Sequence, residues 1–233
     1  MLLSAGLGTR LRPLTDRLPK PLLRVGDETL IERHLRLLAR AGITNVVINL
    51  HHLGDLIRQQ IGDGARWGLH VHYAEEPELL ETGGGIRAAL SALGTAPFLV
   101  VSADLWTDYD LRRLCQPIAG APLLPDGMLA RLVLVPSHLG QDFGFAHTPA
   151  RGAVAAFSAD PAEKFTYASL GLYSPALFDA APEGAFPLRD LLFPALRAGR
   201  LCGELLIGDW FNIGSLRELE DVRRHVGQSA IGS

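Results

Sequence analysis

Leu3-Ser4-Ala5-Gly6-Leu7-Gly8-Thr9-Arg10-Leu11-Arg12-Pro13-Leu14-Thr15 stands near the start of this chain, and Pro19-Lys20-Pro21 follows it. The pattern is a glycine-rich turn that leaves a short apolar strand and precedes two cations. Glycines let a backbone approach an anion closely, turn N–H groups form an anion-binding nest, and Arg10 and Lys20 can neutralise a polyphosphate. We therefore expect a triphosphate cradle built from Ala5, Gly6, Gly8, Thr9, Arg10 and Lys20.

The position of the lysine separates this turn from a Walker A loop. No Gly-Lys-Ser/Thr closes the turn, and Lys20 lies beyond a segment bounded by prolines. A simple ATPase is therefore disfavoured, and an ordinary tight turn with surface cations is the alternative interpretation. Because the first strand has only a few residues after Met1, we also expect the true start to lie upstream.

Composition limits the class of protein. The chain has 233 residues, of which 48% are hydrophobic, so it can bury the core of one α/β domain. A net charge of −3 gives no broad basic field and argues against extended nucleic-acid binding. Its two cysteines, Cys115 and Cys202, form no CxxC pair and favour neither a zinc site nor a disulfide framework. No apolar run reaches the roughly 18 residues that cross a bilayer, so we expect no membrane contact and a soluble, cytoplasmic protein.

Helical and extended patterns alternate along the first half of the chain. Apolar residues recur at helical spacing over residues 30–38, with Thr29 as a cap and Gly42 as a stop. The remaining predicted elements of this half are strands at 45–50, 69–73 and 98–102 and helices at 55–61 and 85–93. Such alternation predicts an α/β fold with a Rossmann-like, mostly parallel sheet that has helices on both faces.

A stretch rich in Pro, Ala and Gly at 117–125 marks a change of organisation. Beyond it residues 129–135 are apolar, and we predict strands at 154–157 and 166–173 and helices at 175–181, 188–198 and 215–226. The second half is therefore expected to complete the sheet of the first, without forming an independent domain.

Two further polar segments follow predicted strands, where parallel sheets bind their ligands. Residues 80–86 read LETGGGI, and glycines there would let a flat base lie against backbone, with Glu81 and Gly84 as the nucleotide-binding residues. Asp104 follows the buried strand 98–102, and a carboxylate there can hold Mg²⁺ against phosphate oxygens. A purely structural helix entry and a helix-capping aspartate are the respective alternatives.

In this order, GxGTRLxPLT, PKP, LETGGGI and Asp104 resemble the sugar-1-phosphate nucleotidyltransferases, which join a nucleoside triphosphate to a sugar phosphate and release pyrophosphate. The resemblance covers nearly the whole chain. It implies the nucleotide-diphospho-sugar transferase fold, which is glycosyltransferase-A-like, in a single domain 1–233. Residues 1–116 would be the nucleotide-binding core, and residues 117–233 would complete the sheet and add a small sugar-binding lobe.

The resemblance also implies roles for individual residues. Arg10 and Lys20 become the catalytic cations, and Asp104 matches the family's metal-binding aspartate. Residues 209–215 read DWFNIGS and place Asn212 where the family has a second metal aspartate. An amide oxygen can still bind Mg²⁺, but the lost charge weakens the site. Asp209 is a poor replacement because it would lie on the opposite face of a strand.

On the sugar side, GQDFG at 140–144 resembles a family loop. Asp142 would accept hydrogen bonds from sugar hydroxyls, and Lys164 would hold the attacking phosphate. Ser169, with Ala168, occupies the place of a family Ser-Gly pair. A solvated loop aspartate and a surface lysine are the alternative interpretations of Asp142 and Lys164.

Within the family, LETGGGI and the WTDYD of residues 106–110 look like the members that act on N-acetylmuramate 1-phosphate in cell-wall recycling. The resemblance therefore implies a uridylyltransferase that uses UTP and this sugar phosphate with Mg²⁺, as a monomer or dimer. One alternative is a guanylyl- or thymidylyltransferase acting on a hexose or heptose 1-phosphate. Another is a nucleotide-sugar-binding homologue with weak turnover, because Asn212 replaces an aspartate.

Overall fold

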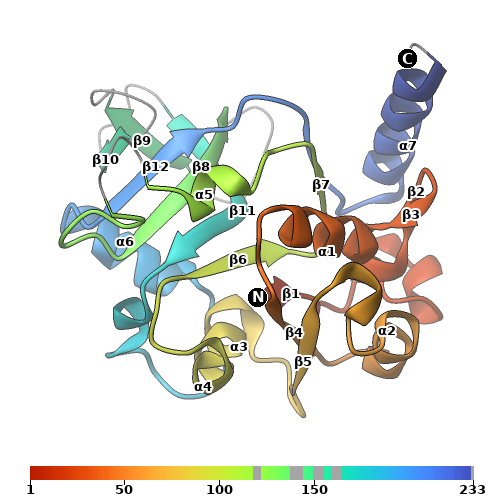
Figure 1. Cartoon of the computed structure of the whole chain (residues 1–233), viewed down its shortest axis with the longest axis horizontal. Helices are drawn as coiled ribbons and strands as arrows, with labels where there is room; N and C mark the ends of the chain where they lie inside the picture. The colour runs from red at the N-terminus through yellow and green to blue at the C-terminus, as the bar shows by residue number, and fades with distance from the viewer. Residues whose placement is uncertain (118–121, 137–143, 149–154, 159–163, 232–233) are drawn as a thin grey trace. The chain divides into compact units, whose positions relative to one another are not determined.

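The protein is described by a computed structural model that covers residues 1–117, 122–136, 144–148, 155–158 and 164–231 (Figure 1). Its chain forms two compact units that interleave along the sequence. Unit 1 consists of Met1, Leu80–Val101 and Leu111–Gly208, and unit 2 of Leu2–Leu79, Ser102–Asp110 and Asp209–Ser233. The C-terminal segment thus belongs with the N-terminal one, and the functional division expected after residue 116 stays a prediction.

Unit 2 contains the parallel strands that the sequence predicts. Strands β1 (Leu2–Leu3), β4 (Asn45–Leu50) and β5 (His70–Glu75) lie in the order β5-β4-β1, and both pairings are parallel. Helices α1 (Leu30–Arg40) and α2 (Gly54–Ile61) provide the crossovers. Because parallel strands need such connections, the alternation of elements identified the fold class correctly.

Helix α1 shows why the prediction of its start was accurate. The hydroxyl of Thr29 accepts the N–H of Glu32 at 3.3 Å, and the Glu32 carboxylate accepts the N–H of Thr29 at 2.9 Å. This capping box satisfies two donors that the first helical turn would leave unpaired. The helix ends before Gly42, whose φ of 81° requires the left-handed conformation that glycine adopts without strain.

Two small antiparallel ribbons complete unit 2. Strand β2 (Arg24–Val25) pairs with β3 (Glu28–Thr29), and β7 (Leu105–Thr107) pairs with β13 (Trp210–Asn212). Helix α7 (Leu216–Ile231) lies beside β2, where the Arg223 side chain donates to the Arg24 carbonyl (Figure 1). Strands of two or three residues carry too little pattern to be predicted from sequence.

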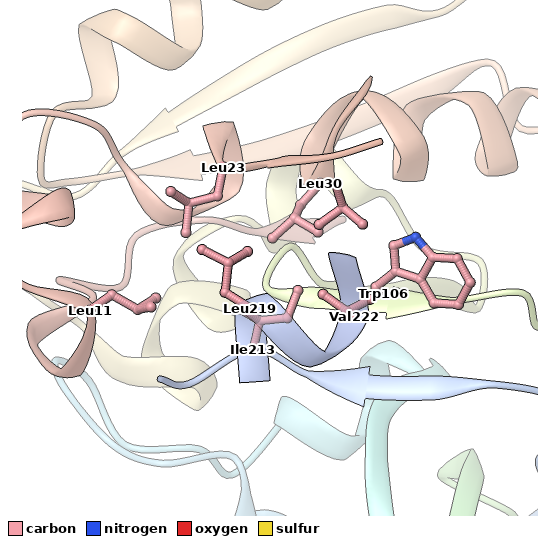
Figure 2. Packing of buried hydrophobic residues seen from close by; sticks show 8 residues of the cluster. Leu11, Leu23, Leu30, Trp106, Ile213, Leu219 and Val222 are labelled. Atoms are coloured by element: carbon pink, nitrogen blue, oxygen red, sulfur yellow. The ribbon is translucent and has the colours of Figure 1, made fainter. Parts of the chain in front are cut away.

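A buried cluster joins these separate segments of unit 2. It brings together side chains from the glycine-rich turn, from β7 and from the end of the chain (Figure 2). Its members are Leu11, Leu23, Val25, Leu30, Trp106, Ile213, Leu219 and Val222. Removal of this apolar surface from water fixes the turn against the C-terminal helix.

Unit 1 has a mixed sheet in the order β6-β11-β8-β12-β10-β9. Strand β12 pairs with β8 in parallel, and β11 pairs antiparallel with β6, β8 and β9. The bounds of the strands are β6 (Phe98–Ser102), β8 (Ala130–Pro136), β9 (Gly144–Thr148), β10 (Ala155–Ser158), β11 (Lys164–Tyr173) and β12 (Leu201–Leu205). The strands predicted at 154–157 and 166–173 are confirmed as β10 and β11, although residue 154 lies outside the described residues. The apolar segment 129–135 forms β8, whereas β9 and β12 were missed.

The helices of unit 1 correct two predictions. Residues 85–93 do not form one helix: α3 (Glu81–Ala88) begins earlier, and the short α4 (Leu90–Leu93) follows it. Residues 175–181 form only a 3₁₀ turn at Pro175–Phe178, where the Ser174 hydroxyl caps the N–H of Ala176. The other helices are α5 (Arg112–Cys115) and α6 (Arg189–Arg197).

A buried ion pair explains why β12 was missed. Glu204 interrupts the apolar pattern of this strand, yet its side chain is only 1% exposed. It accepts from Arg131 of β8 at 2.6 Å and from Arg113 of α5 at 2.9 Å. A carboxylate is tolerated inside a sheet when charge partners of this kind are present.

Within the described residues, no helix combines the length and apolar character needed to cross a membrane.

Candidate functional site

The glycine-rich turn in unit 2 has the shape of an anion-binding loop. Gly8 has a φ of 63°, and a Cβ there would lie 2.8 Å from Cγ2 of Thr15, so a side chain would be both strained and obstructed. The Thr15 hydroxyl donates to the Gly8 carbonyl at 2.8 Å. Gly8 is therefore a glycine for structural reasons, because it allows the chain to turn onto Thr15.

Gly6 is a glycine of a different kind. A Cβ built on it would meet no atom within 4 Å, so the space beside it is open. In the described part of the chain, no carbonyl or side chain accepts the N–H groups of Gly6, Leu7 and Gly8. Open space and free N–H groups are what an approaching phosphate requires. The geometry of the predicted cradle is thus suited to an anion, while the ligand itself stays a prediction.

The entrance to this loop is held by a residue that the sequence did not single out. Asn49, at the end of β4, accepts the N–H of Ser4 at 2.8 Å and donates to the buried Glu76 carboxylate at 2.7 Å. Ala5 follows directly and is buried. An asparagine inside the apolar run 45–50 could have indicated this role in the sequence, because a buried amide must satisfy its hydrogen bonds.

Lys20 and Asp104, which are 84 residues apart, meet in unit 2. The Lys20 ammonium donates to Oδ2 of Asp104 at 2.5 Å, and the Ser102 hydroxyl donates to Oδ1 at 2.6 Å. Burial acts to raise the pKa of Asp104, but the charge of Lys20 and these hydrogen bonds together hold it below its ordinary value. The carboxylate is therefore ionised at neutral pH.

The donor set around Asp104 fits a single hard cation. The Asp104 carboxylate already binds one cation, because it accepts the Lys20 ammonium at 2.5 Å. Ile213 donates its N–H to the Asp104 carbonyl at 3.0 Å, which brings the backbone of Asn212 beside Asp104. Among the described residues, no group of three or more His, Cys, Asp and Glu side chains forms a metal cage. Mg²⁺ bound by one carboxylate and by substrate phosphates needs no such cage.

Arg10 is exposed and lies over Gly214. A Cβ at Gly214 would be 2.8 Å from Nη2 of Arg10 and 3.1 Å from Nη1, so a side chain there would displace the guanidinium. The N–H of Gly214 donates to the Glu218 carboxylate at 2.9 Å, and the Ser215 hydroxyl donates to the same oxygen at 2.8 Å. The S-x-x-E pattern at 215–218 could have revealed this capping arrangement. The contact with Arg10 could not have been predicted.

The glycines of LETGGGI, in unit 1, are explained by packing. They lie inside α3, and the N–H groups of Gly83 and Gly84 donate to the Phe186 carbonyl at 2.9 and 3.1 Å. A Cβ at Gly83 would lie 2.3 Å from the Phe186 ring, and one at Gly84 would lie 2.2 Å from the Gly184 carbonyl oxygen. The segment is therefore a helix start and not the loop that we expected. The expected role of Glu81 and Gly84 in binding a nucleotide base stays a prediction.

The structure describes two of the three residues that we predicted on the sugar side. Asp142 lies outside the described residues, and Lys164 is the first residue of β11. Ser169 is half-buried in the same strand, where the register with β8 shifts between Tyr167 and Gly171. Its φ of 59° is unusual for a residue with a side chain. Their predicted contacts with a sugar phosphate remain untested.

Known proteins resemble this chain along almost its entire length. A family model described as nucleotidyl transferase matches residues 1–229. An N-acetylmuramate alpha-1-phosphate uridylyltransferase of Neisseria meningitidis is 38% identical over 231 residues, with 97% of each chain covered. One from Caulobacter vibrioides is 32% identical, with 92% of this chain and 90% of the relative covered.

Solved structures support the same fold. A putative glucose-1-phosphate thymidylyltransferase from Bacillus anthracis has a TM-score of 0.81 and 21% identity, with 96% of this chain and 93% of that chain covered. A UDP-glucose pyrophosphorylase complexed with UDP-glucose has a TM-score of 0.78 and 15% identity, with 98% and 97% covered. The predicted nucleotide-diphospho-sugar transferase fold is thereby confirmed.

Proposed function

The chain belongs to the nucleotidyl transferase family, and we propose that it joins UTP to N-acetylmuramate 1-phosphate and releases pyrophosphate. The product would be UDP-N-acetylmuramate, which suits a role in cell-wall recycling. The choice of UTP and of this sugar rests on the two uridylyltransferases that share 38% and 32% of their aligned residues with this chain.

One observation carries the proposed chemistry. The open loop at Gly6 and the Lys20–Asp104 pair belong to the same compact unit, as does Arg10, whose guanidinium lies beside Gly214. Phosphoryl-group chemistry needs cations and N–H donors arranged around phosphate oxygens, and it needs no nucleophile from the protein. This set of groups matches that need.

The reaction can be written with these residues. An oxygen of the sugar phosphate attacks the α-phosphorus of UTP in line, the new P–O bond forms, and the bond to the pyrophosphate oxygen breaks. Because the attacking phosphate is already ionised, no general base is required. We propose that Arg10 stabilises the negative charge of the β- and γ-phosphates, and that the N–H groups of the turn donate hydrogen bonds to the oxygens of these phosphates. Lys20 would hold the reacting phosphates.

Asp104 would hold Mg²⁺, with the Asn212 amide as a weaker second ligand. When bound, this ion neutralises charge on the phosphate oxygens. Orientation of the triphosphate would still fall to the turn and to Arg10, since both act on oxygens away from the carboxylate.

A substrate panel tests the proposal. Pyrophosphate release is measured for UTP, GTP, dTTP and ATP, each with N-acetylmuramate, glucose, mannose and heptose 1-phosphates and Mg²⁺. We expect the highest kcat/KM for UTP with N-acetylmuramate 1-phosphate. Lys20→Ala should lower this value at least about tenfold, which is about 1.4 kcal/mol of transition-state stabilisation. A clear preference for another base or sugar would refute the assignment.

A second candidate rests on Asn212 alone. If the second carboxylate is indispensable, the protein binds UTP without turning it over. The panel then gives binding without pyrophosphate, and Asn212→Asp creates activity. Efficient turnover by the natural sequence would exclude this candidate.

A further inference from the structure

We propose that Lys20 is the resident counter-ion of Asp104 in the ligand-free protein, and that a divalent cation binds this carboxylate only by displacing the ammonium from Oδ2. The proposal rests on the function above for the identity of the second partner of Lys20, a triphosphate. It concerns the state of the site before that ligand arrives.

The contacts leave the carboxylate with both oxygens engaged. Lys20 occupies Oδ2 at 2.5 Å, and the Ser102 hydroxyl occupies Oδ1 at 2.6 Å. The side chain of Lys20 is only 12% exposed, so it is held in place and not merely near. Asp104 is 28% exposed, and a metal ion can therefore reach it from solvent.

Electrostatics makes the ammonium and a divalent cation competitors. A dipositive ion on Asp104 would lie within a few ångströms of the Lys20 charge, and the two would repel. At that separation the repulsion weakens binding of the metal about tenfold, even with the dielectric screening of water. A triphosphate removes the conflict because it gives Lys20 other anionic oxygens. Metal and triphosphate should consequently bind cooperatively.

Titration with Mn²⁺ alone, followed by the electron paramagnetic resonance signal of the free ion, tests this inference. Lys20→Met should bind Mn²⁺ about tenfold more tightly than the natural protein, although the same variant loses turnover. Lys20→Gln keeps a donor for Oδ2 but not the charge, and should also bind more tightly. Lys20→Arg keeps the charge and should not.

Arg12→Met is the matched control. Arg12 belongs to the same segment of chain and pairs with Asp16 at the surface, with side chains 59% and 52% exposed. Its removal changes the net charge by the same amount without touching Asp104, so Mn²⁺ affinity should stay within about twofold, as expected for a screened surface charge. Adding Asp104→Asn to Lys20→Met should abolish the gain and so locate it at the carboxylate.

Unchanged or weaker Mn²⁺ binding by both Lys20→Met and Lys20→Gln, with native circular dichroism, would overturn the inference. So would tight binding that persists without the Asp104 carboxylate. The titration needs no turnover, so this failure is distinct from failure of the proposed function. A protein that transfers uridylyl groups without competition by Lys20 would retain the function and lose only the inference.

Discussion

Gly214→Ala is the sharpest test of how the site is assembled. The added methyl group would lie 2.8 Å from Nη2, 3.0 Å from Cζ and 3.1 Å from Nη1 of Arg10. Ordinary contact needs about 3.5 Å, so the guanidinium must retreat by about 0.7 Å. Misplacement by about 1 Å can cost up to about a hundredfold in rate, and we expect kcat/KM to fall about tenfold.

Stability should hardly change in this variant. Arg10 is exposed and its side chain can swing away, and Gly214 does not have a left-handed backbone that an alanine would strain. We expect a loss of less than about 1 kcal/mol in the free energy of unfolding, which is typical of surface substitutions. Gly227→Ala on α7 is the matched control, because its Cβ would meet nothing within 4 Å. It should leave turnover intact and leave stability equal or slightly higher.

The assay compares kcat/KM for UTP in the natural protein, Gly214→Ala, Arg10→Ala and the double variant. If Gly214 acts through Arg10, the glycine substitution costs nothing further once the arginine is gone. Such non-additivity is the signature of residues in contact. Full activity of Gly214→Ala, or an equal loss in the Arg10→Ala background, would refute the reasoning.

Three further predictions concern stability, each followed by urea or thermal unfolding. Burial lowers the pKa of His34 to about 4 in the folded protein, whereas the pKa of an unfolded histidine is near 6.5. Between pH 6.5 and pH 4, therefore, the His34 imidazole is protonated in the unfolded chain but not in the folded one. The free energy of unfolding should therefore decrease as the pH is lowered through this range, by at most about 1.4 kcal/mol per pH unit. His34→Gln should remove this contribution to the pH dependence, and an unchanged pH dependence in the variant would contradict the role of His34. Gly83→Ala should destabilise by about 2 kcal/mol, because its Cβ would lie 2.8 Å from the Phe186 carbonyl oxygen as well as against the ring; an unchanged unfolding midpoint argues against that packing. Ser169→Gly should raise stability by about 0.5–1 kcal/mol by relieving the φ of 59°, and a lower melting temperature would count against strain there.

Local signals predicted those parts of the fold that depend on neighbours in sequence. The start of α1 followed from Thr29, and β4 followed from the apolar run after Asn45. The alternation of helical and extended patterns then identified the fold class. These features need only the 3.6-residue and 2-residue periods and the chemistry of a helix cap.

Contacts between distant segments could not be predicted. β7 has three residues and finds its partner β13 far along the chain, with Trp210 opposite Thr107. The glycines at 83 and 84 suggested an open loop, whereas the carbonyls of Gly184 and Phe186 require them. A sequence shows that a glycine is present but not which atom excludes its side chain.

The buried cluster of unit 2 connects the predicted cradle to the end of the chain. Leu11 lies one residue after Arg10 and belongs to the same buried cluster as Ile213 and as Leu219 and Val222 of α7 (Figure 2). Ile213 directly precedes Gly214, beside which the Arg10 guanidinium lies. The same helix supplies Glu218, whose carboxylate holds the N–H of Gly214. Helix α7 therefore fixes both sides of the Arg10 contact, one through apolar burial and the other through a hydrogen bond. The two interactions complement each other, because burial alone is non-directional and a single exposed hydrogen bond contributes only about 1 kcal/mol.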